Sequence, residues 1–137
     1  MLVDTDVLIF DLEESELCYA PQFGAAKDPV NIAGMIAANH LRGDLPLARW
    51  ELLEGAEARI IDVRGPEEYR AGHLPTAVNI PLDQLRGRLG EIPREGEIWV
   101  ICGVGQRSYY AARLLMQCGF RIKELSGGMQ TYQGFKA

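Results

Sequence analysis

The residue of this sequence best placed to do chemistry is Cys102. It directly follows the apolar run Ile98–Ile101 and precedes a short loop that ends at Arg107. In an open α/β sheet, ligands bind beyond the carboxyl ends of the strands, where the N-terminus of the next helix offers free N–H groups and a positive dipole end. A thiol held there beside an arginine is expected to ionise readily and to act as a nucleophile.

The loop after Cys102 has the composition of a small anion site. Its two glycines let the backbone curl so that successive N–H groups point inward, and Arg107 supplies a cation. We therefore predict that Cys102 is catalytic. The predicted substrate-binding residues are Gly103, Val104, Gly105, Gln106 and Arg107. Three more residues are predicted to support the loop, namely Asp62 and Arg64, as an ion pair at the end of a neighbouring strand, and Ser108.

The three cysteines, Cys18, Cys102 and Cys118, show no C-x-x-C spacing. They predict neither a disulfide framework nor a zinc site, so no metal is expected. Cys118, in the last turn of a predicted helix, is expected to pack in the core, and Cys18 lies in an acidic stretch unsuited to a thiolate. Packing as a small buried hydrophobe is also the alternative reading of Cys102.

The composition is that of one ordinary globular domain. The chain has 137 residues, 47% of them hydrophobic, which is enough to bury a core without disulfide or metal staples. Residues 1–20 hold six acids and no Lys or Arg, so the net charge of -5 leaves +1 for the rest, and a nucleic-acid partner is not expected. The apolar runs are too short for a membrane span and no signal peptide opens the chain, which predicts a cytoplasmic protein with no membrane partner.

Residues 1–45 are predicted to form an N-terminal arm and residues 46–137 an α/β domain. In the arm we expect a short helix at Asn31–Leu41, with Asn31 as its N-cap and Gly43 as its stop. In the domain, strands alternate with helices, which predicts a parallel sheet covered on both faces, with Ile98–Ile101 as the central strand. The expected helices lie at 48–53, 66–69, 82–89, 108–118 and after 128, and the other strands at 59–62, near 78 and at 121–125.

Five motifs lie along the chain from about residue 45 to residue 137. They are Asp62-Val-Arg64, Glu67-Glu-Tyr69, the run from Gly72 to Pro81, the loop from Cys102 to Ser108, and Leu125-Ser-Gly-Gly-Met129. Together they resemble the rhodanese-like sulfurtransferase domain. The resemblance implies a five-stranded parallel sheet with helices on both faces, and a Cys102 that takes up sulfane sulfur as a persulfide and passes it to a thiol acceptor.

Two positions depart from this resemblance. Tyr132 stands where many members of the family carry Trp, and position 103 is Gly rather than a basic residue. The second departure weakens the case for thiosulfate, so the expected sulfur donor is a low-molecular-weight persulfide or polysulfide.

The arm carries a second resemblance, over the run Tyr19-Ala-Pro-Gln-Phe-Gly-Ala-Ala-Lys-Asp-Pro-Val-Asn-Ile-Ala-Gly34. It is similar to the end of the dimerisation domain of flavin-dependent pyridine nucleotide-disulfide oxidoreductases, particularly coenzyme A-disulfide reductases and NADH oxidases. This implies a flavin-dependent disulfide reductase as a partner and allows a homodimer through the arm. Because the flavin and nucleotide domains are absent, no cofactor is expected, and we interpret the chain as the C-terminal piece of such an enzyme or a stand-alone relic of one.

Two other functions stay open. A cysteine phosphatase or arsenate reductase also places a thiolate in an anion-binding loop that ends in arginine. In those families, however, the cysteine and the arginine are separated by one residue more than the four that separate Cys102 from Arg107. A non-catalytic docking or dimerisation module of a disulfide reductase is the second alternative. Nucleotide binding is not expected, because Gly103 to Ser108, with Glu124 downstream, lacks the third glycine of the dinucleotide fingerprint.

Overall fold

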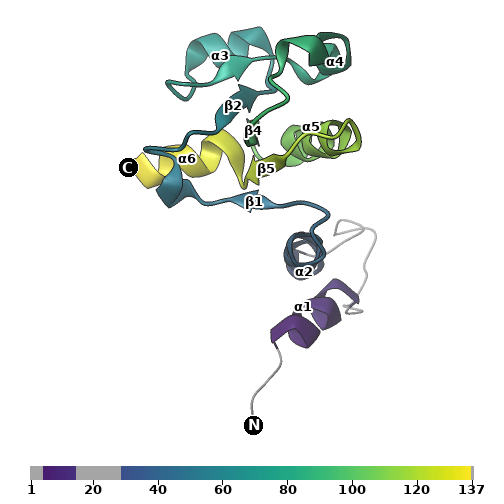
Figure 1. Cartoon of the computed structure of the whole chain (residues 1–137). Coiled ribbons are helices and arrows are strands. Elements are labelled where there is room, and N and C mark those ends of the chain that lie inside the picture. The colour runs from purple at the N-terminus through teal and green to yellow at the C-terminus, as the bar shows by residue number, and fades with distance from the viewer. Residues whose placement is uncertain (1–4, 15–28, 137) are drawn as a thin grey trace, which may run out of the picture. The chain divides into compact units, whose positions relative to one another are not determined.

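The computed structural model describes residues 5–14 and 29–136. The chain divides into two compact units, Met1–Leu45 and Pro46–Ala137 (Figure 1). Cys18 and most of the reductase-like run lie outside the described residues, so the structure does not describe them. No helix in the described ranges has the length and apolar character needed to cross a membrane.

The first unit pairs two helices, α1 (Thr5–Glu14) and α2 (Pro29–Leu41). The close approach depends on Gly34, since a Cβ there would lie 2.6 Å from the backbone nitrogen of Glu13. The prediction of Asn31 as an N-cap was wrong. Helix α2 already begins at Pro29, and the Asn31 amide instead donates to the carbonyl of Leu12 at 3.2 Å. The predicted stop is confirmed, because Gly43 follows α2 with a φ of 75°.

The second unit carries the α/β sheet. Its strands run in the order β1-β5-β4-β2-β3 and all pair in parallel, so the predicted five-stranded parallel sheet with helices is confirmed. Strand β4 is central and all four of its residues are buried, as its apolar run predicted. The elements are β1 (Leu47–Ala48), a 3-10 turn (Trp50–Leu52), β2 (Arg59–Asp62), α3 (Pro66–Ala71), β3 (Val78–Asn79), α4 (Leu82–Leu85), a 3-10 segment (Arg86–Glu91), β4 (Ile98–Ile101), α5 (Gln106–Gln117), β5 (Ile122–Leu125) and α6 (Gly128–Lys136).

Two predicted helices were wrong in kind or in length. The segment predicted as a helix at 48–53 holds strand β1 and a 3-10 turn, because tertiary contacts override its local helical preference. Trp50 closes that turn by donating from its indole to the carbonyl of Ser126 at 2.9 Å and by stacking on Tyr132. The helix predicted at 82–89 is α-helical only to Leu85 and departs from helical geometry at Arg88.

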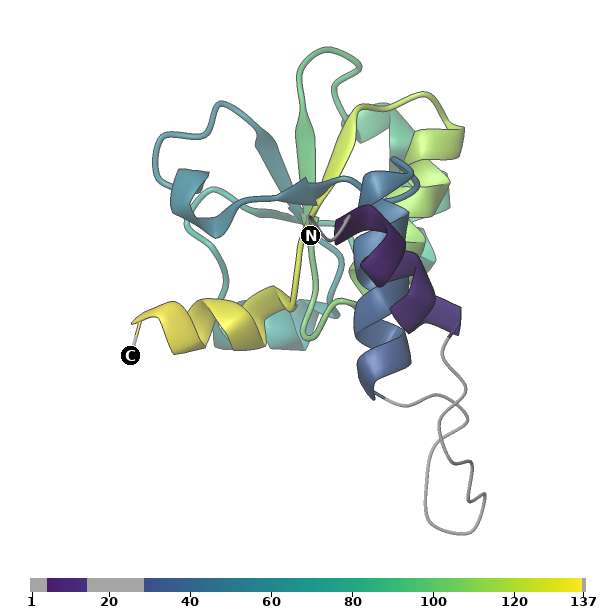
Figure 2. The same cartoon turned by 90° about the horizontal axis from the view of Figure 1, so that it is seen from below.

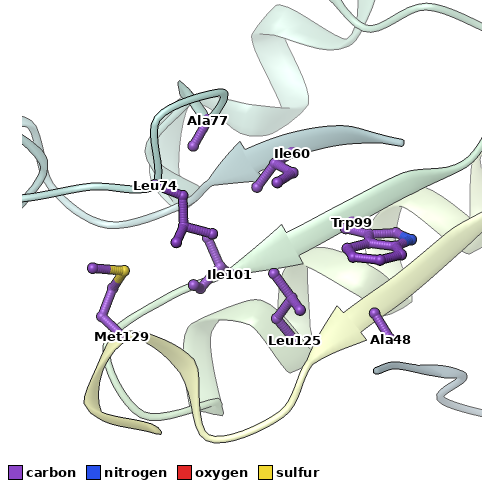
Figure 3. Close-up of a cluster of buried hydrophobic side chains, with 8 residues drawn as sticks. All are labelled: Ala48, Ile60, Leu74, Ala77, Trp99, Ile101, Leu125 and Met129. Carbon is purple, nitrogen blue, oxygen red and sulfur yellow. The ribbon is translucent and has the colours of Figure 1, made fainter. Parts of the chain in front are cut away.

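Helices α5 and α6 cover opposite faces of the sheet. One face carries a buried cluster to which both β5 and α6 contribute. Its members are Ala48, Ile60, Leu74, Ala77, Trp99, Ile101, Leu125 and Met129 (Figure 3). Side chains alternate along a strand, so Glu124 and its register partner Val100 point to the other face. Helix α5 packs there, and Figures 1 and 2 show the strands lying between α5 and α6.

Candidate active site

Cys102 lies directly after the central strand and is completely buried. Its sulfur faces two hydrogen-bonding groups of the next helix turn. The backbone N–H of Gly105 donates to Sγ at 3.1 Å, and the hydroxyl oxygen of Ser108 lies 3.3 Å from Sγ. A sulfur that receives an N–H from the start of a helix is suited to carry negative charge, since both the donor and the helix dipole favour an anion.

The first two carbonyls of the loop are hydrogen-bonded to backbone N–H groups of α6. The carbonyls of Cys102 and Gly103 accept the N–H groups of Met129 and Gln130 at 2.8 and 3.1 Å, at the start of α6. Gly105 caps α5 with a φ of 109°, a left-handed conformation that favours glycine. Gly128 is equally constrained, because a Cβ there would collide with the Cys102 carbonyl. Gly105 and Gly128 therefore allow the loop conformation in which the Gly105 N–H points toward the thiol.

Arg107 does not stand free at the rim of the loop. Its guanidinium forms a bidentate ion pair with Glu68 of α3, at 2.6 and 2.8 Å, with both side chains about two-fifths exposed. The carboxylate also accepts the N–H of Gly65. The hydrogen bonds from Arg107 lower the pKa of Glu68 to about 2, so the pair stays charged at neutral pH. The partner is 39 residues away in sequence, and no local pattern indicated it.

Asp62 and Arg64 form the ion pair that the sequence predicted. The guanidinium contacts the carboxylate at 2.7 to 3.1 Å, and both side chains are buried. The remaining bonds of this pair fix the chain after β2, because Arg64 also donates to the carbonyl of Gly72 and Asn79 donates to the carbonyls of Asp62 and Arg64. The adjoining Val63 N–H bonds to the carbonyl of Ile101, the last residue of β4 before Cys102.

Glu124, like Glu68, is a residue to which the sequence interpretation gave no role in this site. It is 4% exposed on β5, and its carboxyl oxygen Oε1 is hydrogen-bonded to the buried hydroxyl of Ser108. Burial raises the pKa of this carboxyl, although the Ser108 bond acts in the opposite direction. The sequence did contain a sign of this burial. In the strand predicted at 121–125, side chains alternate between the two faces, which puts the Glu124 carboxyl on the same face as the apolar Ile122.

The remaining candidates lie farther from the sulfur. The side chains of Val104 and Gln106 are exposed. Cys118 is half-buried at the end of α5 rather than part of the core, so that expectation was wrong. Across residues 5–14 and 29–136, no cluster of three or more His, Cys, Asp or Glu side chains could hold a metal ion.

Comparison with known proteins places this site in a family context. The family model described as "Rhodanese-like domain" matches residues 48–134. A curated protein named "Sulfurtransferase" from Allochromatium vinosum is 34% identical over 79 residues, which are 57% of this chain and 74% of that protein.

Two solved structures resemble nearly the whole chain. The Bacillus anthracis protein titled CoADR-RHD has 41% identity and a TM-score of 0.82 over 90% of this chain, and the NAD-dependent persulfide reductase from A. fulgidus has 39% identity and a TM-score of 0.75 over 89%. This chain spans only 23% and 22% of those proteins, and less than half the length of the first curated relatives that it matches.

Proposed function

We propose that this chain, which belongs to the family of rhodanese-like domains, is a sulfurtransferase that carries sulfane sulfur as a persulfide on Cys102. Relatives named as sulfurtransferases support sulfur transfer in general. The observation that carries the specific proposal is the Gly105 N–H that donates to the buried Cys102 sulfur at the start of α5. That donor would stabilise the thiolate that attacks and leaves in each half of the reaction.

The reaction has two nucleophilic steps. In the first, the Cys102 thiolate attacks the sulfane sulfur of a donor RSS⁻, a new S–S bond forms, the donor's S–S bond breaks and RS⁻ leaves. In the second, an acceptor thiolate attacks the outer sulfur of the Cys102 persulfide, and the Cys102 thiolate leaves with the bonding electron pair. Each step conserves charge and needs no external oxidant, because the oxidation state of the transferred sulfur is carried over from the donor.

The Arg107–Glu68 pair supports a low-molecular-weight persulfide or polysulfide as the donor. Thiosulfate carries its charge on a sulfonate, which needs unpaired cations around the loop. Position 103 supplies none, and the charge of Arg107 is already balanced by Glu68. The same balance disfavours the alternative of a cysteine phosphatase or arsenate reductase, since a tetrahedral oxyanion also requires the arginine.

The reductase-like matches support a partner. Two longer proteins contain a region similar to this chain. One is titled an NAD-dependent persulfide reductase, and the other is titled CoADR-RHD. We propose that this chain exchanges sulfur with the thiol of a flavin-dependent disulfide reductase. A non-catalytic docking role in such an enzyme is the competing proposal, and it predicts that Cys102 takes up no sulfur.

Mass spectrometry after exposure to a persulfide donor tests the proposed function. We expect a gain of about 32 Da, the mass of one sulfur atom, on the peptide containing Cys102, followed by its loss when a small thiol is added. Cys102→Ser should abolish both the gain and the transfer, whereas Cys118→Ser is the matched control and should retain them. Absence of sulfur on Cys102, or equal damage by Cys118→Ser, would show that the proposal is wrong.

A further inference from the structure

Three buried groups form a hydrogen-bonded chain beneath the loop. The Cys102 sulfur lies 3.3 Å from the hydroxyl oxygen of Ser108, and that hydroxyl is in turn bonded to Oε1 of Glu124. Cys102 and Ser108 are fully buried and Glu124 is 4% exposed. The sulfur-transfer steps above use the sulfur but leave the buried carboxyl without a role.

The serine hydroxyl has one proton and more than one acceptor within reach. Besides Sγ and Glu124, the carbonyl of Gly105 lies 2.9 Å from it. If Glu124 is an anion, the serine proton is held by the carboxylate and the sulfur loses that donor. If Glu124 is protonated, its own O–H can donate to the serine oxygen, which frees the serine proton for the sulfur. The proton on Glu124 thus decides whether Ser108 can stabilise a thiolate.

We propose that Glu124 is a positioning residue that receives the proton of the Cys102 thiol through Ser108, so that one negative charge is shared between the carboxyl and the sulfur. Two arrangements contain the same two protons. In one, the thiol donates to Ser108 and Ser108 donates to the Glu124 carboxylate. In the other, the Glu124 carboxyl donates to Ser108 and Ser108 donates to the Cys102 thiolate. A concerted shift of both protons moves the charge from carboxyl to sulfur.

The surroundings of the chain favour this sharing. The register neighbours of Glu124 are Leu47 on β1 and Val100 on β4, both apolar. The neighbouring Lys123 alternates to the other face and is paired with Glu97. Among the described residues, two further charged pairs lie near the loop, Arg107 on α5 with Glu68 on α3, and Asp62 with Arg64 at the end of β2. A second negative charge in this apolar setting is strongly disfavoured, so Cys102 and Glu124 are expected to titrate as a coupled unit.

The inference rests on the proposed function in taking Cys102 as the nucleophile, but its test does not depend on sulfur transfer. We would follow the ultraviolet absorbance of the thiolate from about pH 5 to about pH 10, in a protein with Cys18 and Cys118 replaced by Ser and against the Cys102→Ser variant. The coupled unit should release its protons in two steps. Glu124→Gln keeps the shape and can still donate to Ser108 but cannot ionise, so Cys102 should titrate in one step, at least about one pH unit below the second wild-type step.

A matched control and a second variant check that the two steps come from the hydrogen-bonded chain. Glu97→Gln removes a partly buried carboxylate at the opposite end of β4 and should keep both steps. Ser108→Ala keeps Glu124 but breaks the chain, and should bring the two steps together. A single wild-type step that superimposes on that of Glu124→Gln would overturn the inference. Two titration steps in a protein that takes up no persulfide would uphold the inference and refute the proposed function. A single step, superimposed on that of Glu124→Gln, in a protein that does take up persulfide would refute the inference and uphold the proposed function.

Discussion

The polar groups on the two sides of the Cys102 loop differ in burial. Beneath the loop, the Ser108–Glu124 bond and the Asp62–Arg64 pair are buried. At the outer edge of the loop, the Arg107–Glu68 pair is bidentate, at 2.6 and 2.8 Å, yet both side chains are substantially exposed. Water screens the rim pair and cannot compensate the loss of a buried partner. The buried side should therefore govern stability and the state of the thiol, and the rim should govern which donor is accepted.

The largest expected effect comes from the buried ion pair. Asp62→Ala leaves the Arg64 guanidinium buried beside no carboxylate, which should lower the free energy of unfolding by about 3–5 kcal/mol. Glu68→Ala removes a carboxylate of similar geometry from the rim and should cost no more than about 1 kcal/mol. Urea unfolding of the two variants measures both values. Equal losses would contradict the distinction between the two sides of the loop.

A smaller loss is expected at Ser108. Ser108→Ala removes only a hydroxyl, but it leaves the Glu124 carboxyl buried without that partner, so the free energy of unfolding should fall by about 1–3 kcal/mol. In the double variant with Glu124→Gln, the loss should not simply add, because the two residues share one hydrogen bond. A double-mutant cycle in urea checks this, and strict additivity would show that the contact contributes nothing.

Glu124 should also make stability depend on pH. Burial raises the pKa of its carboxyl above the ordinary value of 4.5, so the folded chain keeps a proton that the unfolded chain has lost. Linkage then requires stability to fall as pH rises from about 4.5 through the folded pKa. Glu124→Gln should remove that decline. Glu68 cannot mimic it, because its lowered pKa makes it lose stabilisation only as pH falls from 4.5 toward about 2. Thermal unfolding at a series of pH values separates the two carboxyls.

Part of the buried side could be predicted from the sequence, whereas the Ser108–Glu124 bond could not. Strands β2 and β4 were predicted to the residue. Strand β4 is a continuous apolar run bounded by turn residues, and β2 holds two β-branched apolar residues between Arg59 and Asp62. The Asp62–Arg64 pair follows from residues two positions apart at a strand end. By contrast, β1 has two residues at the edge of the sheet and was predicted as a helix, since its pairing with β5 has no local signal. The Arg107–Glu68 pair likewise depends on how α3 and α5 meet in the folded chain.

The substitution with the smallest expected effect on stability should change the choice of sulfur donor most clearly. Glu68→Gln removes the negative charge beside Arg107 while keeping a side chain of the same shape, so the guanidinium becomes available to an anion. We expect kcat/KM for thiosulfate to rise about fivefold, corresponding to roughly 1 kcal/mol for a partly exposed charge. The value for an organic persulfide RSS⁻ with an uncharged R group should stay the same, because that donor has no sulfonate for the guanidinium to bind. Because the Arg107–Glu68 pair is solvated, the gain in kcat/KM should shrink as the ionic strength is raised.

Glu91→Gln is the matched control. Glu91 also binds an exposed arginine, Arg88, but lies in the segment after α4, so its substitution should change kcat/KM for neither donor. An equal gain for both donors would mean that Glu68 shields the Cys102 sulfur itself rather than the charge of Arg107. No gain for thiosulfate would mean that the Arg107–Glu68 pair does not determine which donor is used.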